Sequence, residues 1–245
     1  MREDQMVTQS PQAVATKDLT VRYPGTHKVR MVDLLSDDEL RTITLGGKTE
    51  SFTRNQTIVG RGEVSGSVYF LTEGRVVSKD ISVKGQEFVV RFFAPGDFFS
   101  WLFMFRRTPS VFEYQAQTSC TVNVIDVNYF EQLVRRDSSL LLRLNSVLIE
   151  RLESAYMVTS EYMTESALPR VAHLIGRLGR RYGNGCNHPV LTGFSQHDIA
   201  MLAGLSRPRT SEALAALQEL GLVTVRREVL VLTNVEQLLA FQPQD

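Results

Sequence analysis

The spacing of apolar positions changes from one part of the chain to the next. From about Lys48 to Val127, apolar residues form short alternating runs, such as SVYFLTEGRVVSKD and EFVVRFFAPGDFF, with glycines between them. Alternation with a period of two predicts half-buried strands, and closely spaced turn residues predict hairpins. We therefore expect an all-β roll or barrel in this part of the chain.

A helical period replaces the alternation from Asn128 to about Glu165. Its apolar stripe is narrow and follows a heptad spacing, which is typical of a long helix that packs against a partner helix. Packing against the chain's own β-roll is the alternative, and we favour a parallel homodimer. The seam residues are Leu141, Leu144, Leu148, Leu152 and Ala155, continued by Thr159 and Tyr162.

The stretch FSQHDIAMLAGLSRPRTSEALAALQELGL predicts two helices joined by a tight turn. Ser195 and Asp198 have the spacing of a capping box, and Gly204 lies where the turn needs a left-handed residue. Ser206 is expected to cap the second helix, with Pro208 in its first turn. A short hairpin over Val223 to Leu232 follows, so the pattern is that of a winged helix-turn-helix.

Shorter helices are expected on either side of these units. One covers Asp37 to Leu45, another covers Leu168 to Tyr182, and Asn234 can cap a last one near the C-terminus. In the second helix of the turn unit, Leu214, Leu217 and Leu220 are expected to form the buried face.

Polar and basic residues gather at the start of the second helix of the turn unit. This is the end that reaches base edges in a helix-turn-helix, which argues against a helical hairpin inside an enzyme. Serine and threonine hydroxyls here are expected to contact phosphates, and wing arginines to clamp the DNA backbone. The expected DNA-binding residues are Ser206, Arg207, Arg209, Thr210, Ser211, Glu212, Arg226 and Arg227. In contrast, the arginines at 170, 177, 180 and 181 are expected to form a solvated helix face.

The composition indicates a globular protein but does not identify a binding partner. The formal net charge is zero, and 43% of residues are hydrophobic, as in a globular protein. The two cysteines are far apart in sequence, which does not resemble a disulfide framework. Neither a signal peptide nor an apolar run of membrane-spanning length is visible, so we expect a soluble cytoplasmic protein.

The order of these segments resembles the cyclic-AMP receptor and fumarate-nitrate regulator (CRP/FNR) superfamily of bacterial transcription regulators. The resemblance covers nearly the whole chain after residue 27 and rests on ordered motifs: GSVYFLTEGRV, FFAPGDFF, QTSCTVNVIDVNYFEQL, LIERL and LAGLSRPRTSEALAALQELGLV. It implies an α+β fold with a flexible arm (1–27), an antiparallel β-roll of the cyclic-nucleotide-binding type (28–127), a dimerisation helix (128–166) and a winged helix-turn-helix (167–245). It also implies a homodimer on a near-palindromic site in double-stranded DNA, with RNA polymerase nearby.

The resemblance implies roles for two residues of the turn unit. Arg207 matches an arginine that reads guanine in the family, through bidentate bonds to O6 and N7. Glu212 stands where the family often carries a second guanine-reading arginine. Glutamate cannot donate to guanine, so the usual half-site is not expected to transfer to this chain.

The β-roll departs from the family pattern where cyclic AMP binds. Trp101 occupies the position of the family's ribose-binding glutamate. Ser110-Val111, or Val111-Phe112 if the gap is moved, stands where the family carries an arginine-serine or arginine-threonine pair for the cyclic phosphate. A phosphate buried without a cation is poorly compensated, so cyclic AMP is not expected. Aromatic residues stand where the family carries these polar ligand-binding residues. They either fill the pocket, which we favour, or line a site for an apolar or aromatic effector; the pocket candidates are Phe99, Trp101, Phe112 and Tyr114.

The sequence lacks the residues that other cofactors and other protein classes would need. An iron–sulfur sensor needs a cysteine cluster, and no cysteine precedes Cys120; haem sensing needs a ligand in the roll, where histidine is lacking. Cys186 and His188 are too few for a metal site. A cupin-like enzyme would need several histidines on neighbouring strands, and a cyclic-nucleotide-binding regulatory subunit would not carry the turn unit. We expect no enzyme activity.

Overall fold

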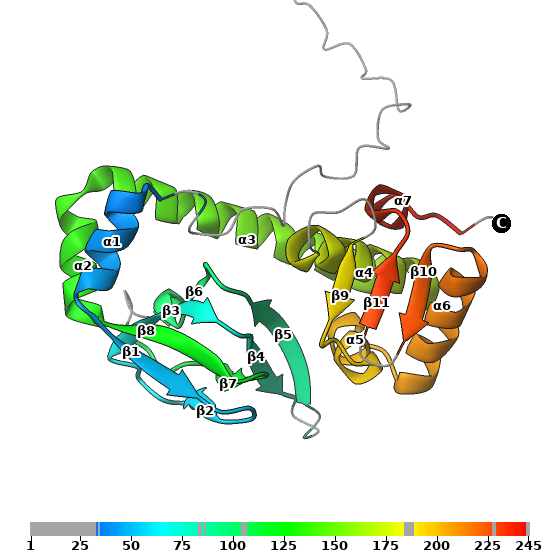
Figure 1. Ribbon diagram of the computed structural model, residues 1–245, viewed down its shortest axis with the longest axis horizontal. Coiled ribbons are helices and arrows are strands. Elements are labelled where there is room, and N and C mark those ends of the chain that lie inside the picture. The colour runs from blue at the N-terminus through cyan, green and yellow to red at the C-terminus, as the bar shows by residue number, and fades with distance from the viewer. Residues whose placement is uncertain are drawn as a thin grey trace, which may run out of the picture.

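The computed structural model describes residues 33, 35–82, 85, 87–103, 107–183, 189–226 and 229–243, so the arm predicted for residues 1–27 lies outside the described part. An N-terminal β-roll and a C-terminal helical unit are joined by one long helix (Figure 1). This confirms the predicted α+β fold. The predicted short helix is present as α1 (Asp37–Leu45), and the structure shows that it begins at a capping box formed by Ser36 and Glu39.

Two antiparallel sheets form the β-roll. The first contains, in spatial order, β1 (Gly47–Phe52), β8 (Cys120–Asp126), β3 (Ser67–Glu73) and β6 (Phe98–Phe99). The second contains β2 (Thr57–Val59), β7 (Glu113–Ala116), β4 (Val76–Ile81) and β5 (Glu87–Phe93). Apolar side chains from both sheets pack into one core cluster, which includes Leu71, Phe93 and Val122.

The helical stretch predicted as one segment consists of two helices. Helix α2 (Val127–Arg136) ends at Asp137, and α3 (Ser138–Thr164) begins immediately after it. Asp137 has an extended backbone, and its carboxylate accepts hydrogen bonds from the backbone N–H groups of Ser139 and Leu140. An aspartate in this position caps a new helix, which is the physical reason for the break.

The C-terminal unit combines four helices with a small sheet among its described residues. The helices are α4 (Ala167–Tyr182), α5 (Gln196–Ala203), α6 (Arg207–Glu219) and α7 (Val235–Leu239). The predicted hairpin is present as β10 (Val223–Arg226) and β11 (Val229–Leu232), and β9 (Val190–Thr192), which the sequence did not predict, adds a third strand beside β11.

The C-terminal unit packs against the second sheet of the roll, with α5 beside β5 (Figure 1). Phe92 of β5 contacts Phe194 edge-on at 5.1 Å between ring centroids, within one core cluster shared by both units. The Arg75 guanidinium donates to the backbone carbonyls of Thr192 and Gly193. In the described part of the chain, no helix is both long and apolar enough to cross a membrane.

The arginines of α4 are not a solvated face, which corrects that expectation. Arg181 donates to both carboxylate oxygens of Asp97 at 2.6 Å, across the contact between the roll and the C-terminal unit. Arg177 pairs with Glu161, and Arg180 pairs with Glu236. Arg170 donates to backbone carbonyls at the end of α3. The partners of Arg177, Arg180 and Arg181 lie 16, 56 and 84 residues away in sequence, so helical spacing could not reveal them.

Candidate nucleic-acid interface

The turn between α5 and α6 forms as local sequence signals predict. The Ser195 hydroxyl accepts from the Asp198 backbone N–H, and the Asp198 carboxylate accepts from the Ser195 N–H, which completes a capping box. Gly204 has φ 61°, a left-handed conformation that favours glycine. A Cβ at this position would also approach the Tyr162 ring to 2.8 Å.

Helix α6 is held by one apolar face. Ala213, Leu214 and Leu217 are buried against the C-terminal core. Leu220 is 57% exposed, because the helix ends at Glu219; the prediction that it belongs to the buried face is wrong. Ser206 is the N-cap residue by backbone position, but its side chain makes no capping hydrogen bond.

Most of the predicted DNA-contacting residues lie on the exposed first turns of α6. Ser206, Arg207 and Arg209 are exposed, and so are Ser211 and Glu212. The Arg207 guanidinium donates from Nε to His197 Nδ1 at 3.3 Å, which links the tip of α6 to α5. The arrangement presents two guanidinium groups and one carboxylate at the end of a helix whose opposite face is buried.

Thr210 is the exception and corrects the prediction. Its side chain is fully buried, and its hydroxyl donates to the backbone carbonyl of Ser206 at 3.1 Å. A hydroxyl in this position supports the first turn of the helix and cannot reach a phosphate. Arg226 is exposed at the end of β10, whereas Arg227 lies outside the described residues.

The aromatic pocket candidates are packed against one another in the roll. Phe99 and Tyr114 are at most 2% exposed, and their ring centroids lie 5.4 Å apart. Tyr69 stacks on Phe99 at 5.1 Å between ring centroids, and Phe93 contacts the rings of Phe99 and Tyr114. Burial raises the pKa of Tyr114 to about 12. Phe112 is half-buried at the edge of this cluster.

Trp101 belongs to a different cluster. It lies in the short 3₁₀ helix η3 (Trp101–Phe103), is 1% exposed, and packs among residues of the roll, α2 and α3. The Arg151 guanidinium of α3 lies 5.0 Å from its ring centroid. Burial, together with the nearby Arg91, lowers the pKa of Arg151 to about 9.

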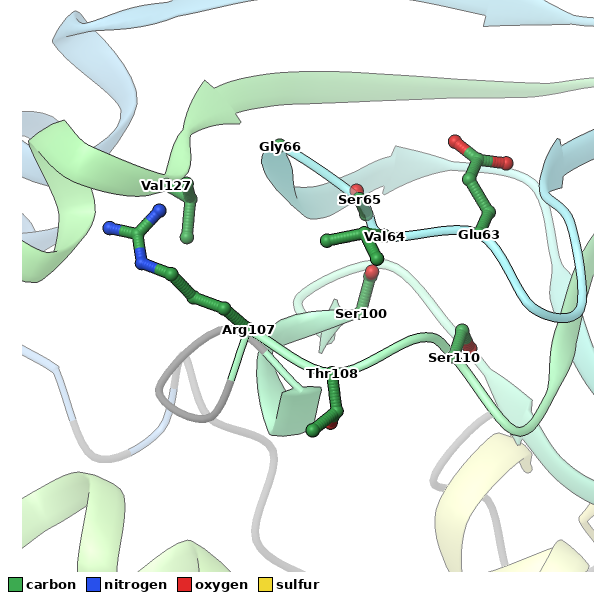
Figure 2. A pocket seen from close by; sticks show the side chains of 9 residues that line it. All are labelled: Glu63, Val64, Ser65, Gly66, Ser100, Arg107, Thr108, Ser110 and Val127. Carbon is green, nitrogen blue, oxygen red and sulfur yellow. The ribbon is translucent and has the colours of Figure 1, made fainter.

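A small cavity lies beside Trp101 and Ser110, at the positions where the sequence departs from the expected cyclic-AMP-binding residues. It has a volume of about 100 Å³ and is lined by residues that include Ser100, Arg107 and Ser110 (Figure 2). The Ser110 hydroxyl donates to the Phe112 carbonyl, and the Arg107 guanidinium forms an ion pair with Glu131 and donates to Asn128 Oδ1. Pockets for small molecules typically hold about 300–1,000 Å³, so this cavity is small for a nucleotide.

The predicted dimer seam on α3 is largely exposed. Leu141, Leu148 and Leu152 are 36–52% exposed, and Ala155 is exposed as well. Leu144 is 2% exposed because, with Leu140 and Val147, it packs against α2 and the roll; its assignment to the seam is wrong. Further exposed apolar residues extend this face, and they are Leu142, Ile149, Tyr156 and Met163.

Comparison with known proteins gives the family. The model described as "Cyclic nucleotide-binding domain" matches residues 49–137, and that described as "Crp-like helix-turn-helix domain" matches residues 169–241. The cAMP-activated global transcriptional regulator Vfr of Pseudomonas aeruginosa is 26% identical over 186 residues, which cover 74% of this chain and 86% of that protein. The corresponding regulator CRP of Salmonella typhimurium is 24% identical over 187 residues, with coverage of 74% and 87%.

The chain belongs to the CRP/FNR superfamily. It is a CRP-like transcription regulator with a helix-turn-helix DNA-binding domain. Two solved structures share its fold. FixK2 from Bradyrhizobium japonicum superposes with a TM-score of 0.68 at 22% identity, covering 78% of this chain and 95% of that one. A CooA mutant from Carboxydothermus hydrogenoformans superposes with a TM-score of 0.69 at 18% identity, covering 86% and 94%.

Proposed function

We propose that this CRP/FNR-superfamily protein binds a near-palindromic promoter site as a homodimer, without cyclic AMP as its effector. The carrying observation is the exposed first part of α6, where Arg207 and Arg209 extend from a helix anchored by buried Leu214 and Leu217. A rigid helix with basic residues at its N-terminal end is suited to the major groove. Domain limits of 28–127, 128–166 and 167–245 for the roll, linking helix and DNA-binding domain belong to this proposal.

Individual side chains have distinct chemistry for DNA. Arg207 can donate two hydrogen bonds to guanine O6 and N7, and Glu212 can accept from a cytosine amino group. Arg209, Ser206 and Ser211 are exposed beside them and are suited to phosphate contacts, as is Arg226 at the edge of the wing. The target half-site therefore differs from one read by two arginines.

The homodimer is proposed to form through the exposed face of α3. Leu148, Leu152 and Ala155 continue the heptad spacing and are not covered by the described part of the chain. A contiguous exposed apolar face on a long helix is typical of a coiled-coil interface. A parallel pair of α3 helices would place two α6 helices on one side of the dimer, as two half-sites require.

The loss of cyclic-AMP binding is supported by what fills the roll. Trp101 and the cluster around Phe99 and Tyr114 occupy the interior, and the nearby cavity holds about 100 Å³. This interior fits best a regulator whose DNA-binding activity is controlled by its own abundance or by a partner. The packed rings also admit a second candidate, an apolar or aromatic effector that would have to displace a ring. Contact with RNA polymerase, a cytoplasmic location and the lack of enzyme activity are further parts of the proposal.

The decisive experiment selects bound sequences from random duplex DNA with the purified full chain. We expect enrichment of a two-fold symmetric motif, and unchanged enrichment when cyclic AMP is added. Light scattering on the same sample should give the mass of a dimer, and Leu152→Glu should give a monomer, with exposed Glu153→Gln as the matched control. An asymmetric motif, a cyclic-AMP requirement or a monomeric wild type would each contradict the corresponding part of the proposal.

A further inference from the structure

A cluster of three arginines lies where the β-roll, the long helix and the DNA-binding domain meet. Arg91 lies on β5 of the roll, Arg151 lies on α3, and Arg181 lies on α4 (Figure 1). The carboxylate of Asp97, between β5 and β6, is among them and is 1% exposed. Arg181 donates to both oxygens of this carboxylate, whereas Arg91 Nη2 lies 4.0 Å from Asp97 Oδ1. One carboxylate is therefore already used by one member of the arginine cluster.

Arg151 is the member of the arginine cluster that lacks a carboxylate. Its Nη2 donates at 3.4 Å to the backbone carbonyl of Phe98, and its guanidinium lies 5.0 Å from the centroid of the Trp101 ring. It forms no ion pair with any carboxylate of the described residues. In contrast, Arg143 on the same helix pairs with Glu39 at 2.8 Å. The positive charge of Arg151 is therefore left with a carbonyl and an aromatic ring.

The arginine cluster carries more positive than negative charge. Asp97 supplies one negative charge, and Glu150 of α3, which attracts Arg91, supplies a second. Burial and the neighbouring Arg181 lower the pKa of Arg91, and burial and Arg91 lower the pKa of Arg151 to about 9. These directions mean that the surroundings disfavour a positive charge on both groups. An anion between them would supply the missing compensation.

The arginine cluster offers hydrogen-bond donors that an anion can use. The Nε atoms of Arg91 and Arg151 are buried and have no hydrogen-bond partner. The Arg91 side chain is nevertheless 29% exposed, so solvent reaches one side of the cluster. Guanidinium groups bind phosphate through two parallel N–H···O bonds. A phosphate has enough oxygens to accept from arginines on two elements at once, which a single carboxylate such as Asp97, already engaged with Arg181, does not provide.

We propose that Arg91 and Arg151, with Arg181 beside them, form a binding site for the phosphate group of a small molecule. The ligand would join β5 of the roll to the long helix, next to the contact that Arg181 and Asp97 make with the DNA-binding domain. A bound phosphate would therefore stabilise the docked position of that domain. The site stands on the charges and contacts of the arginine cluster, and only its effect on DNA binding rests on the proposed function.

Calorimetric titration of the purified full chain tests the inference. In a phosphate-free buffer of constant ionic strength, inorganic phosphate and glycerol phosphate should each bind at one site per chain. Tighter binding of the first would identify the free ion as the ligand, and tighter binding of the second would identify a phosphate ester. Arg91→Gln and Arg151→Gln should each weaken binding by about tenfold or more, because each removes hydrogen bonds to a charged group. Arg143→Gln removes a paired guanidinium from the same helix and is the matched control, with binding equal to that of the wild type.

The stability of the ligand-free variants separates a binding site from a structural contact. Arg151 has no ion pair and lies near the like charge of Arg91, so Arg151→Gln should lower the Tm of the ligand-free protein no more than Arg143→Gln does. The same variant should lose the rise in Tm that phosphate gives to the wild type, whereas Arg143→Gln should keep it. A larger fall in ligand-free Tm for Arg151→Gln would show that the guanidinium is structural.

Four binding results would overturn the site. These are no saturable binding of either probe to the wild type, binding that survives in both Arg91→Gln and Arg151→Gln, an equal loss in Arg143→Gln, or a loss in Arg207→Ala, which would place the anion on the DNA-binding surface. Circular dichroism verifies folding. Arg151→Lys, which keeps the charge but loses the forked donor and should also weaken binding, replaces Arg151→Gln if the latter does not fold. Loss of DNA binding with intact phosphate binding would contradict the proposed function alone.

Discussion

The β-roll and the DNA-binding domain both enclose a small apolar core, but the candidate functional residues are buried in the roll and exposed in the DNA-binding domain. In the roll, Phe99, Trp101 and Tyr114 point inward and are at most 2% exposed. In the DNA-binding domain, the first turn of α6 presents Arg207 and Arg209 to solvent. The comparison shows that close packing of large rings takes up the volume a ligand would need, whereas a binding surface on a helix end needs no internal volume.

The largest expected effect lies in the filled interior of the roll. Phe99→Ala removes a ring that contacts Tyr69, Phe93 and Tyr114, and we expect it to lower the free energy of unfolding by about 3–5 kcal/mol. Urea denaturation measures the change. Phe88→Ala, at a residue that is 39% exposed, is the control and should cost much less. A loss below that of Phe88→Ala would mean that the ring lines an open effector site.

The second prediction concerns the contact between the two regions. Asp97→Asn leaves the buried Arg181 guanidinium without its carboxylate, and we expect a loss of about 3 kcal/mol or more in unfolding free energy. The change is measured by urea denaturation, together with faster proteolysis between the roll and the DNA-binding domain. Asp80→Asn breaks a partly exposed pair with Arg61 and should cost less than about 1 kcal/mol. Equal effects of the two variants would show that the regions do not stabilise each other.

The third prediction separates base reading from general attraction to DNA. Arg207→Ala should weaken binding to the selected sequence by about 1–3 kcal/mol and relax preference at one base pair. Fluorescence anisotropy on selected and scrambled duplexes measures both. Ser211→Ala, a neighbouring exposed change that removes a proposed phosphate contact but no base-reading group, is the control and should weaken binding to both duplexes alike. An equal loss on both duplexes would refute the base contact of Arg207.

The smallest expected effect belongs to the wing. Arg226→Ala should weaken binding to all sequences alike and reduce the slope of log affinity against log salt by about one. Titrations at several salt concentrations measure that slope, with the wild type as reference. A loss restricted to one sequence would instead place Arg226 at a base edge.

Local signals in the sequence predicted much of the fold. The bounds of α1, the capping box at Ser195 and the left-handed Gly204 depend on neighbouring residues, and all are present. The break at Asp137 has an equally local cause, an aspartate cap, but the helical period was predicted to run from Asn128 to about Glu165 without a break. A continuous apolar period therefore concealed the boundary.

The candidate site was predicted less completely, for a physical reason. Periodicity shows that a side chain lies on an apolar or polar face, but it does not show what covers that face. Leu144 fits the heptad spacing of the seam yet packs inside its own chain, and Thr210 fits the polar turn yet is fully buried. Both errors concern which neighbour is nearest in space.

The order of residues was enough to establish a β-roll, a long helix and a winged helix-turn-helix, because caps, turns and periods act within a few residues of one another. Folding in three dimensions was needed to bring Arg181 to Asp97 and His173 to Glu161 and Phe241. Such contacts join positions that are far apart along the chain. Their charges meet only after the apolar cores have packed and removed water from the space between the elements.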